Sequence, residues 1–99
     1  MKIAVIGDIH ENTHNLILAL DKIKELNAER ILCLGDLMNK GIAEILAAFE
    51  IPVFSIWGNN DGDKVAITKT SLGVNSKLKM GFTTFEALEI ENRKIFLTH

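Results

Sequence analysis

The residues of this chain best suited to chemistry stand in short polar stretches, each of which follows an apolar run. In most of them a glycine comes directly before the polar residue, at Gly7, Gly35 and Gly58. Glycine lets a chain bend sharply and keeps side-chain atoms away from a ligand. In chain order the candidates are Asp8 and His10 in "GDIH", Asp36 in "GDLM", Asn59, Asn60 and Asp61 in "GNND", and His99 in "LTH".

Carboxylate, imidazole and amide groups in this pattern indicate a bound cation. Taken singly, an Asp or Asn after a strand usually forms a turn or caps a helix. Taken together, Asp8, Asp36 and Asp61 would repel one another in a common crevice unless a metal ion neutralised them. Almost no Lys or Arg stands beside them to do so.

Two other kinds of ion or phosphate site do not fit the spacing. In an EF-hand loop beginning at Asn59, Lys64 would take the place of the turn glycine and Thr70 that of the bidentate glutamate. The chain also lacks the GxGxxG and GxxxxGK[ST] patterns that cradle phosphates.

Alternating strands and helices have to bring these distant residues together. Apolar runs predict strands at 2–7, 30–35 and 52–57, and apolar residues at helical spacing predict helices at 14–27 and about 40–49. This order is typical of the α/β class, with a βαβαβ unit that forms a parallel sheet with helical crossovers. Such sheets bind ligands beyond the carboxyl ends of their strands, where the polar stretches fall.

The pattern changes in the last third of the chain. A short helix is expected after Asp61. The segments 82–90 and 93–99, joined by a tight turn at "EN", predict a C-terminal β-hairpin that extends the sheet or starts a second one.

Composition limits the class of protein. With 99 residues, 47% of them hydrophobic, the chain is expected to form one small domain over 1–99. A net charge of -2 argues against strong nucleic-acid binding. No apolar run approaches the roughly 18 residues of a membrane span, so no membrane partner and a cytoplasmic location are expected. The only cysteine, Cys33, is expected in the core, Trp57 in the core or at the rim, and the lysines at 64, 69, 77 and 79 in solvent.

The three ordered motifs "GDIH", "GDLM" and "GNND" resemble those of the calcineurin-like metallophosphoesterase family: D-x-H, then G-D, then G-N-[HCN]-[DE]. The likeness is to the small prokaryotic phosphodiesterase branch, and it covers nearly the whole chain. It implies an αββα sandwich, of which this chain would be the N-terminal βαβαβ part plus a hairpin. It also implies a metal-dependent phosphoesterase, most naturally one that hydrolyses phosphodiesters with a metal-bridging hydroxide at a dinuclear site.

The resemblance also assigns ligands. Asp8 and His10 would hold the first of two divalent ions, Asp36 would bridge both, and Asn59 and His99 would bind the second. Mixed oxygen and nitrogen ligands suit manganese, which we expect first, and also nickel, iron or zinc.

The implied catalytic residues are Asp36, Asn59, Asn60 and Asp61. Asn60 stands where many family members carry a His that protonates the leaving group, and an amide cannot do so. Asp61 is therefore expected to support a ligand, and diesters are expected to be better substrates than monoesters.

The chain stops at His99, where the family continues with further His motifs. We therefore expect the N-terminal part of a longer protein or a truncated product. If the chain is complete, weak metal binding and little turnover are expected.

Other functions stay open at this point. A catalytically weak or inactive scaffold for protein interaction is the main alternative, because the fold also resembles a retromer subunit with that role. A flavodoxin-like receiver domain has an acidic cluster at its strand ends too, but His10 argues against it. The expected partner is a small phosphorylated substrate, and assembly into a homo-oligomer is left open.

Overall fold

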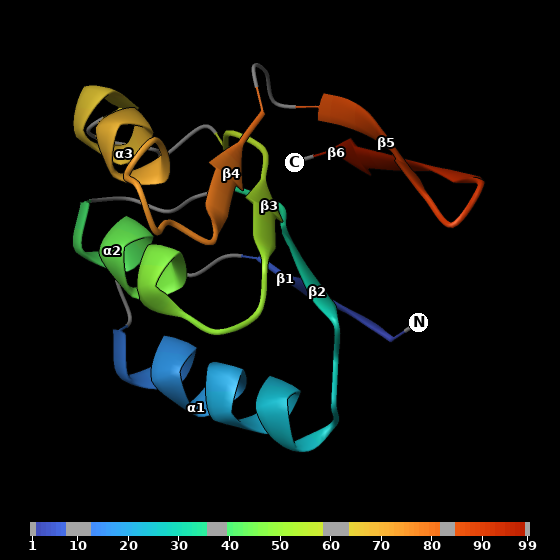
Figure 1. The fold of residues 1–99 in the computed structure, drawn as a ribbon, viewed down its shortest axis with the longest axis horizontal. Helices are drawn as coiled ribbons and strands as arrows, with labels where there is room; N and C mark the ends of the chain where they lie inside the picture. The colour runs from blue at the N-terminus through green and yellow to red at the C-terminus, as the bar shows by residue number, and fades with distance from the viewer. Residues whose placement is uncertain (1, 8–12, 36–39, 59–63, 82–84, 99) are drawn as a thin grey trace.

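The computed structural model describes residues 2–7, 13–35, 40–58, 64–81 and 85–98. Within these ranges strands and helices alternate, and a pair of strands follows (Figure 1). The elements are β1 (Ile3–Ile6), α1 (Thr13–Glu25), β2 (Arg30–Cys33), α2 (Lys40–Ala48), β3 (Val53–Ser55), α3 (Lys64–Ser71), β4 (Leu78–Met80), β5 (Phe85–Ile90) and β6 (Arg93–Thr98).

The first four strands form a parallel sheet in the order β1-β2-β3-β4. The predicted βαβαβ unit is therefore confirmed, with a helix between each pair of neighbouring strands. β4, which pairs with β3 through Val53 and Leu78, was not predicted from the sequence. It has only three residues and no periodic pattern of its own.

The helices lie together on one face of the sheet (Figure 1). The core between them contains Ile42 and Leu46 of α2 and Ile67 of α3, each 0% exposed, packed against sheet residues such as Cys33. Cys33 is thus the core residue that was predicted. These apolar positions recur at helical spacing, so each helix buries one stripe and leaves its polar side in water.

The first helix is shorter than predicted. Leu16, Leu20 and Ile23 are buried on its inner face, but the helix ends at Glu25 rather than at 27. Asn27 has a φ of 59°, a left-handed conformation that stops a helix. Leu26, which directly follows the helix, is 53% exposed.

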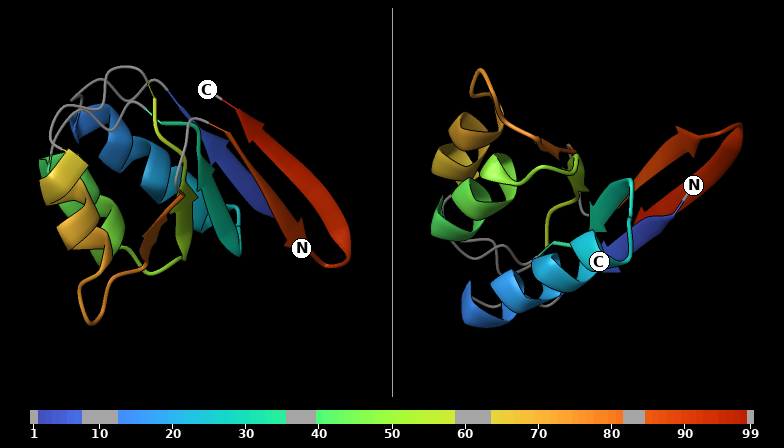
Figure 2. Two further views of the ribbon diagram at one scale, coloured as in Figure 1. Left: turned by 90° about the horizontal axis from the view of Figure 1, so that it is seen from above. Right: turned by 60° about the horizontal axis from the view of Figure 1, so that its bottom comes forward.

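The hairpin of β5 and β6 covers part of the opposite face (Figures 1 and 2). It starts a second, antiparallel sheet rather than extending the first. Leu97 of β6 packs with Leu32 of β2 and Ile56 beyond β3 in a separate small core. The molecule therefore has three layers: helices, parallel sheet and hairpin.

The hairpin turn has the predicted position. Ile90 pairs with Arg93, which leaves Glu91 and Asn92 as a two-residue loop. Both have positive φ, 50° and 66°, as a type I′ turn requires.

Among the described residues, no helix combines the length and the apolarity that crossing a membrane requires.

Candidate active site

The sheet register brings the starting points of the polar stretches to one edge. Ile6 is level with Cys33, and Cys33 is level with Ser55. Backbone bonds extend the pairing past the strands, from Leu34 N to Ile6 O at 2.9 Å and from Ile56 N to Cys33 O at 3.0 Å. The chain therefore leaves β1, β2 and β3 on the same side of the molecule.

The predicted site residues lie outside the described residues. This applies to Asp8, His10, Asp36, Asn59, Asn60, Asp61 and His99. The described residues that directly precede the motif residues are Gly7, Gly35, Gly58 and Thr98.

Gly35 and Gly58, which precede the second and third motif residues, touch each other. A Cβ placed on Gly35 would lie 2.5 Å from Gly58 N and 2.8 Å from both Gly58 Cα and Trp57 C. Gly35 also has a φ of 98°, which side-chain-bearing residues rarely adopt. Only glycine permits this approach, and both glycines are buried.

Trp57, next to Gly58, links the end of β3 to the end of β4. Its indole Nε1–H donates to the carbonyl oxygen of Gly81, just beyond β4, at 2.9 Å. The side chain is only 9% exposed and belongs to the core between the helices and the sheet. This confirms the expected core position and ties the end of β3 to the end of β4.

A lysine lies close to this corner. The Lys64 ammonium, at the first residue of α3, lies 5.8 Å from the centre of the Trp57 ring. Lys64 is exposed, as predicted, but its contact with the indole was not predicted. Such cation–π contacts contribute about 0.5–1 kcal/mol at exposed sites.

The last strand runs toward the same edge. Figure 2 (left) shows β6 running toward the side of the molecule where β1, β2 and β3 end. Leu97 packs against Ile56 and Leu32, which places the end of β6 over the carboxyl ends of the central strands. The chain thus reaches Thr98, before the predicted ligand His99, on the side that the motif hypothesis requires.

The described residues are compatible with a metal site but do not contain one. No group of three or more His, Cys, Asp or Glu that could hold a metal occurs in the described ranges. The backbone before Asp36 and Asn59 does meet at the Gly35–Gly58 contact. A carboxylate and an amide oxygen attached to neighbouring backbone are suitable ligands for a divalent ion.

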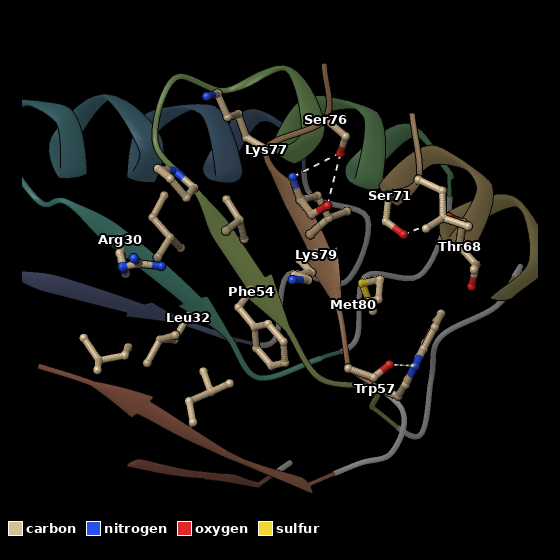
Figure 3. A pocket seen from close by; sticks show the side chains of 18 of the residues that line it. Arg30, Leu32, Phe54, Trp57, Thr68, Ser71, Ser76, Lys77, Lys79 and Met80 are labelled. Carbon is tan, nitrogen blue, oxygen red and sulfur yellow. Dashed lines mark hydrogen bonds between the residues drawn. The ribbon is translucent and has the colours of Figure 1, made fainter. Parts of the chain in front are cut away.

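A cavity of about 940 Å³ opens beside β4 (Figure 3). Phe54 and Lys79 of the sheet, Leu88 and Ile90 of the hairpin, and Thr68 of α3 line it. It approaches the edge described above only at Trp57 and Gly81. We therefore do not equate this cavity with the site at the strand ends.

A parallel sheet with helices on one face and an antiparallel hairpin on the other gives the chain a mixed α/β fold. The chain belongs to the calcineurin-like phosphoesterase superfamily, since the model of that superfamily domain matches residues 1–99.

One relative and one solved structure are similar along the whole chain. Phosphodiesterase MJ0936 of Methanocaldococcus jannaschii is 24% identical over 99 residues, which are 100% of this chain and 58% of the relative. A solved structure described as a novel archaeal phosphodiesterase has a TM-score of 0.87 at 24% identity, over 100% of this chain and 59% of that one. The chain thus spans a little under three fifths of the proteins it matches, and the likeness to the solved structure establishes the fold.

Proposed function

We propose that this protein is a metal-dependent phosphodiesterase with two divalent ions, manganese first among them, at the carboxyl ends of the parallel strands. The observation that carries the proposal is the Gly35–Gly58 contact, because it joins the backbone before the second and third motifs. Membership of the calcineurin-like phosphoesterase superfamily and the phosphodiesterase name of the relative support it.

In this proposal the ligands come from separate segments of the chain. Asp8 and His10 would hold one ion, Asn59 and His99 the other, and the Asp36 carboxylate would be shared. When bound, such a pair of ions neutralises phosphate charge and acidifies a water molecule. Asp61 would help to orient the ligand residues without binding a metal ion itself.

The residue after Asn59 limits the substrate. Asn60 has no proton to give at neutral pH, so the protein would not protonate the leaving group from that position. A diester with a good leaving group is then a better substrate than a simple monoester. We infer a small phosphorylated substrate and a cytoplasmic location, and we leave homo-oligomer formation open.

Hydrolysis of two chromogenic esters tests the proposal. Bis(p-nitrophenyl) phosphate and p-nitrophenyl phosphate are compared with the wild-type protein and the Asp36→Ala variant, with Mn²⁺ or Ni²⁺ added. We expect diester hydrolysis that needs the added ion, exceeds monoester hydrolysis and falls at least about 100-fold in the variant. Bound metal without turnover would favour the scaffold alternative. A wild-type protein that shows no bound metal and no turnover would contradict the proposal.

A further inference from the structure

Trp57 connects three parts of the molecule whose relative positions determine where the third motif begins. Its indole N–H donates to Gly81 O at 2.9 Å, beyond β4. Its own carbonyl carbon is part of the surface that faces Gly35. The next residue along the chain, Gly58, directly precedes Asn59.

The hydrogen bond restricts the backbone at this corner. Trp57 is 9% exposed, so its indole N–H has little access to water and the bond to Gly81 satisfies it. Turning the indole away would break that bond, and the Trp57 backbone has little room to shift, because its carbonyl carbon closely faces Gly35. The side chain therefore holds the Trp57–Gly58 peptide in one position against β2's end.

We propose that Trp57 is a positioning residue for the third motif. By tying Gly58 between Gly35 and Gly81, it fixes the point from which the chain enters Asn59. The inference rests on the proposed function, since it concerns the affinity of the motif residues for a divalent ion. Groups that orient ligands in this way typically change metal affinity 10–100-fold when they are removed.

A substitution pair separates positioning from simple stability. Trp57→Phe keeps a large aromatic side chain in the core but removes the donor to Gly81. Val53→Ala is the matched control, because Val53 belongs to the same core cluster and lies at the start of β3, the strand that leads to Trp57. Mn²⁺ affinity is measured by equilibrium dialysis, and melting temperature by circular dichroism.

We expect Trp57→Phe to bind Mn²⁺ at least about tenfold more weakly than wild type. We expect the Mn²⁺ affinity of Val53→Ala to stay within about twofold of wild type, even if its melting temperature falls as much as that of Trp57→Phe. Equal affinities in the two variants at similar melting temperatures would overturn the inference and leave the proposed function intact. A wild type that binds neither Mn²⁺ nor Ni²⁺ would overturn both.

The wild-type protein offers a second measurement that does not depend on the folding of a variant. Trp57 is the only tryptophan and the chain has no tyrosine, so the tryptophan fluorescence of the protein reports on the surroundings of Trp57 alone. Paramagnetic Mn²⁺ bound nearby should quench that emission in a saturable way that parallels the dialysis curve, and Asp36→Ala should abolish the quenching. Emission that stays unchanged while Mn²⁺ demonstrably binds would overturn the inference.

Discussion

Gly35 and Gly58 meet so closely that a single added methyl group on Gly35 would lie 2.5 Å from Gly58 N. The two residues are far apart in the sequence and come from the ends of different strands. Each directly precedes a residue that the motifs mark as a metal ligand. The contact is the part of the described structure that most directly supports a common site.

Replacing Gly35 by alanine is expected to destabilise the protein strongly. The added Cβ would strike backbone atoms, and the φ of 98° is unfavourable for any side chain. Together these effects should cost at least about 2 kcal/mol in the free energy of unfolding. Urea unfolding followed by circular dichroism measures the change.

Gly7→Ala is the matched control, since Gly7 also directly precedes a predicted ligand. A Cβ there would meet Leu34 Cβ at an ordinary 3.6 Å, and its φ is not positive. We expect a change within about 0.5 kcal/mol. Equal losses in the two variants would show that the Gly35 contact is not the tight one described.

Truncating Leu97 is expected to release the hairpin from the sheet. Leu97 is 5% exposed and packs with Leu32 and Ile56 in the smaller core. Leu97→Ala should cost about 2–4 kcal/mol. Hydrogen exchange should speed up in 85–98 more than in the helices and the parallel sheet, and uniform loss of protection would contradict a separately packed hairpin.

Ser76 is expected to protect the outer edge of β4. Its hydroxyl donates to Leu78 O and accepts from Leu78 N–H, both at 3.1 Å. Lys77 O and Gly81 N bond to β3, so Leu78 presents its backbone groups to the open side. Ser76→Ala should cost about 1 kcal/mol and increase self-association, since exposed edges pair with other chains. Sedimentation velocity at several concentrations tests this, and an unchanged monomer would argue against an edge role.

The Lys24–Glu50 pair gives a pH-dependent contribution to stability. The Lys24 ammonium lies 2.7 Å from Glu50 Oε1, and this hydrogen bond, with the carboxylate charge, raises the Lys24 pKa above its ordinary 10.5. A raised folded-state pKa means that the contribution is complete below the unfolded-state value and is lost as pH rises through the folded-state value.

Glu50→Gln should therefore lower stability slightly at pH 8 and have a vanishing effect at higher pH. Both side chains are exposed, so added salt should shrink the difference. Urea midpoints for the two proteins from pH 8 to pH 11 test this. A difference that grows with pH would have the wrong sign.

Apolar runs and helical spacing were enough to predict β1, α1, β2, α2 and β3 in the right order. The hairpin turn was also predictable, because "EN" separates two runs and Asn tolerates positive φ. β4 was missed because a three-residue segment such as Leu78–Met80 has no recognisable pattern, and only its pairing with β3 makes it a strand. The end of α1 was misplaced because Leu26 continues the helical spacing beyond Glu25, whereas the chain turns left-handed at Asn27.

From the sequence, the site could be stated only as a set of residue types expected at strand ends, and that set stays a prediction, because its members lie outside the described residues. Its glycines were noted for flexibility, whereas the feature that matters at Gly35 is contact with a backbone far along the chain. The bond from Trp57 to Gly81 and the position of Lys64 over the indole also depend on tertiary packing. No spacing rule links residues of these types at those separations.

The most direct test of the account is a crystal structure of the protein grown with Mn²⁺, with anomalous scattering recorded for wild type and for Asp36→Ala. The account predicts two anomalous peaks in the wild type, roughly 3.5–4 Å apart, beside the Gly35–Gly58 contact, and neither peak in the variant. Two peaks retained in Asp36→Ala, or metal bound only away from that contact, would contradict it.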